Sequence, residues 1–319
     1  MRTRWCNRHM VFAIALVAVA CSLIVWADDG FSTIYVGQTD GLRISTDGGE
    51  TFLTRTTGDG LGNDWVKGLA IAGGVLVAAT PGGISFSYDG GQTFVARSVY
   101  PGGTTRAARV FLDGATLYVA NNSSFLYVSE DGGETYTNLV RLSSSIYAIA
   151  VDNGSLYVAT GAGVAISRDA GSTFTTVTQA EGLGANVVYD LIATDSCIYA
   201  ATSGGLSISR DEGVSFVTYR QADGLANDRV LCIAVEGEKI FAGTPTGLSV
   251  SHDNGQTYVT CTTANGLASN SISRMSWFEG VLYVAGPSGE LSISYDDAQT
   301  FVAKPAAGLA GLPWAFAVH

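Results

Sequence analysis

The chain is poor in lysine and histidine. Among its 319 residues there are only three lysines and three histidines, whereas 28 residues are acidic. The formal net charge of −11 argues against a nucleic-acid partner and against anionic lipid surfaces, because both attract a surplus of positive charge. The same acidic balance also helps a protein to stay soluble, so it does not identify a partner by itself.

Cysteine is scarce and irregularly spaced. Of five cysteines, Cys6 and Cys21 lie near the N-terminus, which leaves Cys197, Cys232 and Cys261. An odd number at irregular spacing is no disulfide framework. Each of the three sits in a strand-like pattern, where a buried free thiol is expected. No Cys/His spacing typical of a metal site occurs, so neither a metal nor another cofactor is predicted.

A long apolar run occupies residues 10–26. It follows three arginines, Arg2, Arg4 and Arg8. This pattern is typical of a secretory signal peptide, here residues 1–27 with cleavage before Asp28, and it predicts a secreted or periplasmic protein. Loss of the three arginines would leave 14 basic and 28 acidic residues, and no later membrane span is predicted. The run is slightly long for a signal, so the alternatives are an uncleaved anchor and, more weakly, a lipid at Cys21.

An eight-residue phrase, written SYDGGQTF at 87–94, occurs seven times with small changes. Its aspartates are Asp47, Asp89, Asp131, Asp169, Asp211, Asp253 and Asp296, at separations of 42, 42, 38, 42, 42 and 43 residues. Each period contains four short segments rich in β-branched and aromatic residues, such as 230–235, 239–244, 247–251 and 257–263 in the sixth unit. This pattern predicts an all-β fold, a seven-bladed β-propeller with four-stranded blades.

The two ends of the repeat region complement each other. Residues 33–38 match a second strand, whereas residues 314–319 match a first strand. The sequence therefore predicts a single propeller domain over 28–319, whose ring is closed by the C-terminal strand pairing into the N-terminal blade. We expect this domain to be a monomer.

The repeated phrase joins the third and fourth strands of each unit. Its Asp can accept hydrogen bonds from backbone N–H groups, its Gly can adopt a positive φ, and its hydroxyls can tie the strand ends together. These aspartates are therefore predicted to be structural rather than catalytic. The seventh copy has Asp297 and Ala298 where Gly is usual, which predicts a turn of different shape.

The phrase S-x-D-x-G-x-T-F resembles the Asp-box, or BNR, repeat of sialidases, sortilin-type receptors, xyloglucanases and photosystem II assembly-factor propellers. The resemblance covers all seven units. Residues 224–251, GLANDRVLCIAVEGEKIFAGTPTGLSVS, also resemble the propeller repeats of two-component regulators. Both resemblances imply a propeller in a secreted protein of bacterial type, and they imply its fold far more strongly than its function.

The longer loops, from each fourth strand to the next first strand, are expected on the face opposite the Asp-box turns. They are residues 58–65, 100–107, 180–187, 222–229 and 264–271. We take this loop face as the default binding face. Several loops end in a polar residue before the first strand: Asp64, Asn186, Asp228 and Asn270. These residues either hold the turn through the backbone or form a polar binding rim.

The first strands are expected to line the propeller axis. Their alignment places Lys67, Ala108, Tyr147, Tyr189, Leu231, Ser273 and Ala315 at one position, and Gly68, Arg109, Ala148, Asp190, Cys232, Arg274 and Phe316 at the next. Buried charges need partners, so Arg109, Asp190 and Arg274 form either an internal ion-pair network or a ligand site.

Other candidate binding residues lie beside the axis. The short connection at 138–148 predicts a notch in the rim, with Arg141 and Tyr147 beside it. Trp65 either stacks on a ligand or packs between blades. The predicted binding residues are therefore Trp65, Arg109, Arg141, Tyr147, Tyr189, Asp190 and Arg274.

No nucleophile–base arrangement, metal motif or phosphate-binding loop is recognisable, so no catalytic residue is predicted. The favoured function is an exported, non-enzymatic binding scaffold that holds a ligand or a protein partner on the loop face. The expected partner is a protein or a carbohydrate. One alternative is a sialidase-like or other glycoside hydrolase. The resemblance would assign Arg109, Arg274, Tyr147, Tyr189 and Asp190 to such a site, although a signature arginine and an axial glutamate are missing. The other alternative is an assembly factor for an envelope or membrane complex.

Overall fold

The described part of the protein covers most of the predicted propeller region. The computed structural model describes residues 32–319 apart from 100–106, 122–123, 305–308, 310–312 and 314. The predicted signal peptide, residues 1–27, lies outside the described residues and stays a prediction. Within the described ranges, no helix is both long enough and apolar enough to cross a lipid bilayer.

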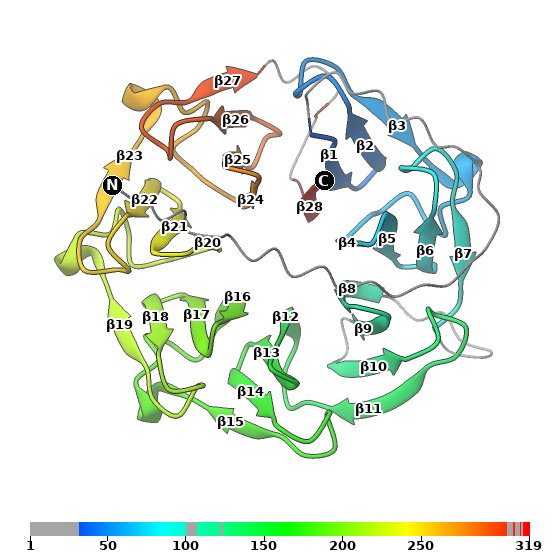
Figure 1. Cartoon of the computed structure of the whole chain (residues 1–319), viewed down its shortest axis with the longest axis horizontal. Helices are drawn as coiled ribbons and strands as arrows, with labels where there is room; N and C mark the ends of the chain where they lie inside the picture. Colours follow the sequence, from blue (N-terminus) through cyan, green and yellow to red (C-terminus); the bar gives the residue numbers. More distant parts are fainter. Residues whose placement is uncertain (1–31, 100–106, 122–123, 305–308, 310–312, 314) are drawn as a thin grey trace, which may run out of the picture. The chain divides into compact units, whose positions relative to one another are not determined.

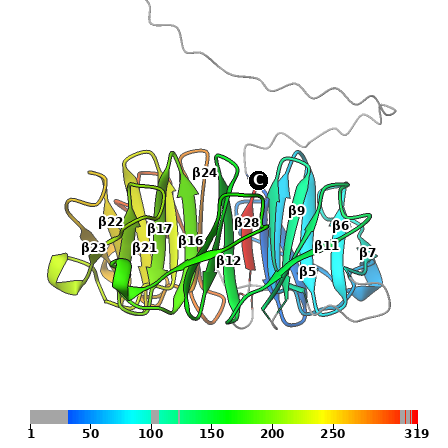
Figure 2. The ribbon, with the colours of Figure 1, turned by 90° about the horizontal axis from the view of Figure 1, so that it is seen from below.

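Seven four-stranded antiparallel sheets are arranged as blades around a central axis (Figure 1). The inner strands of adjacent blades contact each other around the whole ring, from β28 and β4 through to β24 and β28. Side-on, the strands run between two opposite faces (Figure 2). This arrangement confirms the predicted all-β, seven-bladed propeller.

The blades are numbered in chain order, and their strands are given from the axis outward. Blade one contains β28 (Ala315–Val318), β1 (Ile34–Gln38), β2 (Gly41–Ser45) and β3 (Leu53–Arg55); blade two β4 (Gly68–Ala72), β5 (Val75–Thr80), β6 (Gly83–Ser87) and β7 (Val95–Arg97); blade three β8 (Ala107–Asp113), β9 (Thr116–Asn121), β10 (Phe125–Ser129) and β11 (Thr137–Arg141). Blade four contains β12 (Ile146–Asp152), β13 (Ser155–Thr160), β14 (Gly163–Ser167) and β15 (Thr175–Val177); blade five β16 (Val188–Thr194), β17 (Cys197–Thr202), β18 (Gly205–Ser209) and β19 (Val217–Tyr219). Blade six contains β20 (Cys232–Glu236), β21 (Lys239–Thr244), β22 (Gly247–Ser251) and β23 (Val259–Cys261); blade seven β24 (Arg274–Phe278), β25 (Val281–Ala285), β26 (Leu291–Ser294) and β27 (Val302–Lys304).

The ring closes through the predicted pairing of the two chain ends. Strand β28 pairs antiparallel with β1, with Val318 opposite Ile34 and Ala315 opposite Gly37. Beyond the strands, the backbones of Thr33 and His319 exchange two hydrogen bonds, of 2.8 and 3.1 Å. The C-terminal strand thus supplies the inner strand of blade one.

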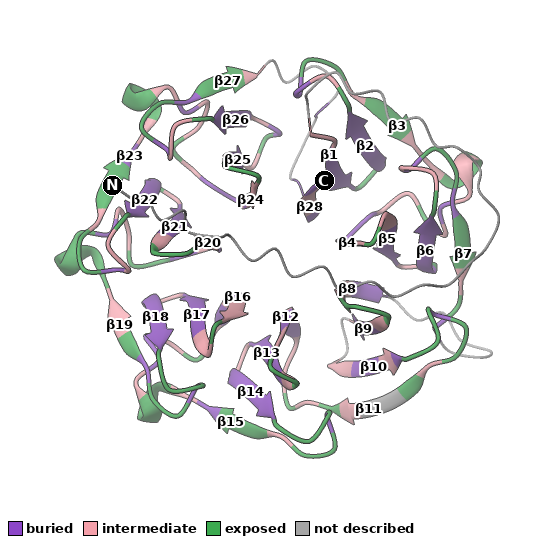
Figure 3. Cartoon of the chain, in the orientation of Figure 1, coloured by how far each residue is buried: buried purple, intermediate pink, exposed green. Residues whose placement is uncertain are grey.

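The hydrophobic core is divided among the joints between blades. Seven clusters of buried side chains are found in the described chain, and each is built mainly from two adjacent blades. In most blades the two middle strands are almost entirely buried, as in blade two, whereas the outermost strands are more exposed (Figure 3). The β-branched and aromatic residues of the middle strands therefore pack against the adjacent blades on both sides, as expected for a sheet between two others.

The three cysteines beyond the N-terminal segment are free thiols. Cys232 and Cys261 are buried as predicted, whereas Cys197, at the start of β17, is partly exposed. Burial raises the pKa of the Cys232 thiol, with the Asp190 carboxylate adding to the rise. This thiol is therefore held in its protonated, unreactive form.

The repeated phrases form seven turns between third and fourth strands, which we call the Asp turns. In the third copy, Asp131 Oδ1 accepts bonds from Ser129 Oγ at 2.7 Å and from the Thr135 N–H at 2.9 Å, and its Oδ2 accepts one from Thr135 Oγ1 at 2.5 Å. The same three bonds recur at every copy, with Ser215 in place of Thr in the fifth. Each carboxylate thus holds its own turn.

The seventh turn corrects one expectation, because it keeps the shape of the others. Asp297 and Ala298 adopt φ values of 59° and 66°, and the Ala298 N–H still donates to the serine of the phrase at 2.9 Å. In the third turn, a Cβ on Gly133 would lie 2.3 Å from the Phe86 ring of the preceding blade. In the seventh turn, the residue of the preceding blade that corresponds to Phe86 is Val250, whose side chain is shorter. Val250 and Ala298 belong to the same hydrophobic cluster. The methyl group of Ala298 therefore fits beside Val250. The remaining energetic cost is that of the left-handed backbone conformation, which a non-glycine residue adopts less readily.

Replacing Asp131 with alanine is expected to lower the melting temperature by several degrees without affecting any partner bound on the loop face. The variant leaves the Thr135 N–H and hydroxyl without their carboxylate acceptor. Thermal unfolding followed by circular dichroism measures the change. Asp131→Asn keeps one acceptor oxygen, so its melting temperature should lie between those of the wild type and of Asp131→Ala. An unchanged melting temperature with lost partner binding would place the ligand at the Asp turns instead.

Candidate functional site

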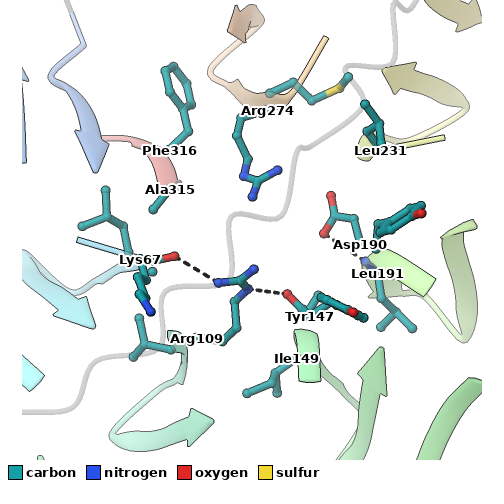
Figure 4. Close-up of a pocket in the computed structure, with 16 residues that line it drawn as sticks. Lys67, Arg109, Tyr147, Ile149, Asp190, Leu191, Leu231, Arg274, Ala315 and Phe316 are labelled. Atoms are coloured by element: carbon teal, nitrogen blue, oxygen red, sulfur yellow. Dashed lines mark hydrogen bonds between the residues drawn. The ribbon is translucent and has the colours of Figure 1, made fainter. Parts of the chain in front are cut away.

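A cavity of about 200 Å³ lies on the propeller axis, at the starts of the first strands. Its charged and aromatic lining residues are Lys67, Arg109, Tyr147, Tyr189, Asp190, Arg274 and Phe316. Most of the remaining wall is apolar and includes Leu69, Val110, Ile149, Leu191, Leu231 and Met275. We call this cavity the axial pocket (Figure 4).

The pairing of first and second strands sets which residues share a level around the axis. One level contains Gly68, Arg109, Ala148, Asp190, Cys232, Arg274 and Ala315, because each pairs with the equivalent small residue of its second strand: Ala79, Ala120, Ala159, Ala201, Gly243, Ala285 and Gly37. These partners are small because the blades crowd at the axis; a Cβ on Gly37 would lie 2.8 Å from Val66 of the next blade. We call this level the charged layer.

The alignment of the last strand was wrong by one residue. Ala315, and not Phe316, stands in the charged layer, because Ala315 is the residue that pairs with Gly37. Every other first strand is tied to its second strand by a short hairpin, which fixes the register from the sequence. Strand β28 has no such turn to β1, so the sequence alone leaves its register open.

Arg109 joins three blades at the axis. Its Nε donates to the carbonyl of Tyr147 at 2.5 Å, and its Nη1 donates to the carbonyls of Lys67 and Ala108 at 3.2 and 2.7 Å. A bulge in β8 between Ala107 and Arg109 accompanies this geometry. Burial lowers the pKa of Arg109 to about 10, and the nearby positive charge of Arg274 adds to the lowering. The guanidinium is therefore cationic at neutral pH but held at a cost.

Arg274 and Asp190 complete the charged layer. The Arg274 guanidinium reaches toward Arg109 across the pocket, with the Asp190 carboxylate to one side (Figure 4). Arg274 Nη1 donates to the Ser273 carbonyl at 2.6 Å. Asp190 accepts the N–H groups of Leu191 and Ile233 at 2.9 and 3.0 Å. Burial raises the pKa of Asp190, although these N–H groups and both arginines oppose the rise.

Aromatic rings surround the loop-face side of the charged layer. Tyr147 and Tyr189 meet edge to face, with ring centroids 6.1 Å apart. The exposed Arg229 lies over the Tyr189 ring at 5.2 Å. Lys67 Nζ lies 3.7 Å from the centre of the Trp65 ring, which links the predicted residue Trp65 to the pocket through a cation–π contact.

The structure brings together five of the seven predicted binding residues and separates one. Arg109, Tyr147, Tyr189, Asp190 and Arg274 all line the axial pocket, with Trp65 beside it. Arg141 is absent from the lining; it is exposed at the end of β11 and lies over the Phe125 ring at 5.3 Å. The predicted anchor formed by Arg141 and Tyr147 beside a notch therefore stays a prediction, with Tyr147 lining the pocket.

Sequence reasoning missed two contributors to this site, Lys67 and Arg229. Lys67 stood in the aligned position that lines the axis, so its place in the alignment was a usable signal. Arg229 ends the fourth of the longer loops and is marked only by its charge. Its contact with Tyr189 joins two blades and has no counterpart in the sequence pattern.

The polar residues that end the loops hold the loops themselves. Four loops begin with 3-10 helices, η1 (Thr57–Asp59), η2 (Gln179–Glu181), η3 (Gln221–Asp223) and η4 (Thr263–Asn265). The side-chain oxygens of Asp64, Asn186, Asp228 and Asn270 accept the N–H of the first residue of these helices, at 2.7, 3.0, 2.7 and 2.8 Å. This bond supports the turn-holding interpretation of these residues.

A second cavity, of about 410 Å³, opens between blades four and five at the side of an Asp turn. Its polar lining includes Arg168, Asp169 and Glu181. Arg168 donates to the carbonyl of Glu212 at 2.8 Å, Asp169 holds its own turn, and Glu181 caps η2. Because these groups already serve the fold, we consider the axial pocket the better candidate despite its smaller volume. No cluster of three His, Cys, Asp or Glu side chains suited to a metal ion occurs in the described ranges.

No protein-family model matches the chain, and no curated protein matches its sequence. Solved structures do match its fold. YCF48 bound to D1 peptide has a TM-score of 0.63 and 15% identity over 80% of this chain and 87% of that one. The extracellular domain of the putative hybrid two-component system BT3049 from B. thetaiotaomicron has a TM-score of 0.64 and 19% identity, over 81% and 38%. The WD40 propeller domain of Doa1 has a TM-score of 0.63 and 14% identity, over 84% and 91%. At these identities the likeness establishes the propeller fold alone.

Proposed function

We propose that this propeller is an exported, non-enzymatic binding scaffold that holds a ligand or a protein partner on its loop face. The observation that carries the proposal is the axial pocket. The blades repeat one another closely at the Asp turns, where repetition serves folding, yet they differ in the charged layer, where Arg109, Asp190 and Arg274 gather. Residues that serve only a repeated fold would agree from blade to blade, so their divergence supports a specific contact.

The chemistry of the pocket favours binding over catalysis. Asp190 is its only carboxylate among the described lining residues, and both of its oxygens accept backbone N–H groups. Most glycoside hydrolases use two carboxyl groups on either side of the bond to be cleaved, whereas sialidases use a tyrosine as the nucleophile. The names of similar structures also support export and binding, since one is an extracellular domain and another is bound to a peptide.

Arg229→Glu, a variant on the loop face, is expected to bind the partner at least tenfold more weakly than wild type. Arg210→Glu, a variant on the face of the Asp turns, is expected to bind it as wild type does. Arg229→Glu reverses the charge that lies over Tyr189, and Arg210→Glu makes the same change on the opposite face. Partners would be captured by crosslinking from the native envelope fraction and then titrated with both variants. Equal binding by Arg229→Glu and wild type, with loss in Arg210→Glu, would move the binding face to the Asp turns. Components of a membrane complex among the partners would favour the assembly-factor alternative.

The sialidase-like alternative is supported by the gathering of Arg109, Arg274 and Asp190 with two tyrosines in one pocket. Fluorogenic sialosides and other glycosides test it directly. We expect no turnover by the purified protein. Turnover that Asp190→Asn abolishes would replace the binding proposal with a hydrolytic one.

A further inference from the structure

We infer that the axial pocket binds a small organic monocarboxylate, with its carboxylate between Arg109 and Arg274 and its short apolar body against the next level of the axis. The inference rests on the proposed binding function and names the ligand class of the same pocket. It follows from the charge, the size and the layered lining of the pocket.

The pocket is positively charged inside an acidic protein. Among its described lining residues are three basic side chains, those of Lys67, Arg109 and Arg274, and one carboxylate, that of Asp190, whereas the whole chain has a formal net charge of −11. Within the described part of the chain, the hydrogen bonds of Arg109 go to backbone carbonyls, which are dipoles and do not cancel its charge. Two like charges in a partly desolvated space are costly, and the Asp190 carboxylate beside them offsets part of that cost. An anion between the two guanidinium groups would lower it further.

The pKa of Arg109 is lowered to about 10, chiefly by burial and secondly by the positive charge of Arg274. Bound carboxylate would act in the opposite direction, because a nearby negative charge favours the cationic form. A carboxylate also matches the planar guanidinium group, which can donate two parallel hydrogen bonds to it.

The next level of the axis is apolar in every blade. In each first strand, the residue that follows the charged layer is apolar. These residues are Leu69, Val110, Ile149, Leu191, Ile233, Met275 and Phe316. All of these except Ile233 line the pocket. We call this level the apolar layer. A ligand held by the charged layer would therefore place an apolar group here more favourably than a hydroxylated one.

The volume limits the size of the ligand. About 200 Å³ corresponds to roughly seven water molecules at their share of liquid volume. Such a space accommodates a carboxylic acid of a few carbons. A sugar acid or a peptide segment is larger than this volume and would have to extend out of the pocket.

Titration with acetate, propionate, butyrate and valerate tests the inference, with chloride at equal ionic strength as the reference. Each added methylene is expected to strengthen binding by about fourfold until the pocket is full, from the free energy of burying one CH₂ group. At a concentration of about 100 times the dissociation constant, the melting temperature should rise by about 5 °C or more. Phosphate and sulfate should bind more weakly than butyrate.

Variants separate the two parts of the site. Arg274→Gln should weaken butyrate binding at least tenfold, and Arg274→Lys should weaken it less because it keeps the charge. Asp190→Asn should strengthen binding, since it removes the negative charge beside the anion. Ile149→Thr should retain acetate binding but flatten the dependence on chain length. Arg210→Gln, on the Asp-turn face, is the matched arginine control and should bind butyrate as wild type does. Cooperative melting of each variant checks that it is folded.

Several outcomes would overturn the inference. Equal affinity for acetate and butyrate would remove the apolar layer from the site. Binding of phosphate or sulfate without binding of carboxylates would change the ligand class, and no binding of any anion would exclude an anion site. Capture of a loop-face partner without carboxylate binding would leave the proposed function standing and refute only this inference. Carboxylate binding without any captured partner would support the inference and refute a protein-scaffold role.

Discussion

Deletion of residues 315–319 is expected to abolish cooperative folding. The deletion removes β28, the inner strand of blade one, and exposes the pairing edge of β1. It also removes Phe316 and Val318 from the cluster that covers Ile34 and Val36. Burial of one large apolar side chain contributes about 1.5–3 kcal/mol. The combined loss is therefore comparable with the whole stability of a typical domain, about 5–15 kcal/mol.

A circular permutant provides the matched control for this deletion. Thr33 and His319 already exchange backbone hydrogen bonds, as the closing pair of a two-residue hairpin does. Placing residues 315–319 before residue 33, joined by Asn-Gly, imitates the turn of Asn153 and Gly154 between β12 and β13. The permutant should melt cooperatively, whereas the deletion should bind hydrophobic dyes and aggregate. A deletion variant that stays monomeric with a wild-type melting curve would contradict the role of β28 in closing the ring.

The repeat made most of the fold predictable from the sequence. The phrase occurs seven times at nearly constant spacing, and short β-branched segments precede and follow each copy. This pattern defines the blades before any contact is known. The observed strands of blade six lie within or close to the predicted segments, and β23 ends earlier because Thr262 caps the following η4. Closure was also predictable, since the two chain ends carry complementary parts of one blade.

The parts that could not be predicted depend on contacts between blades. Ala298 keeps the standard turn because Val250 of the preceding blade is short, and no pattern within the phrase reveals that relation. Arg141 was grouped with Tyr147 because both lie at the short connection 138–148. Tyr147 lines the pocket at the axis, and Arg141 lies at the end of the outer strand β11. Distance along a blade, from axis to rim, is not encoded in local sequence separation.

The candidate site shows the same division. The strand periodicity indicated which residues face the axis, and so it found Arg109, Asp190 and Arg274. It could not show that Arg109 bonds the carbonyls of two neighbouring blades, or that Ile233 of blade six donates its N–H to Asp190. Those contacts join different blades, so the pattern within one blade does not reveal them.

The seven Asp turns are expected to set the acid limit of stability. Hydrogen bonds, first of all from Thr173, lower the pKa of Asp169 to about 2, and Asp253 is lowered to about 2 in the same way, chiefly by Thr257. The pKa is lowered at the other five copies as well. In the unfolded chain these carboxyls recover a pKa near 3.8. As the pH falls, the unfolded state therefore binds protons before the folded state does, which favours unfolding.

The melting temperature should accordingly be nearly constant above about pH 5 and fall steeply between about pH 4 and pH 2. The double variant Thr173→Val and Thr257→Val removes two hydroxyl donors, each 2.6 Å from a carboxylate oxygen. Its acid transition should move to higher pH. Thr175→Val is the control, because this exposed position of β15 is already valine in β7, β19, β23 and β27. A double variant with the same acid midpoint as the wild type would mean that other carboxylates, and not the Asp turns, determine acid unfolding.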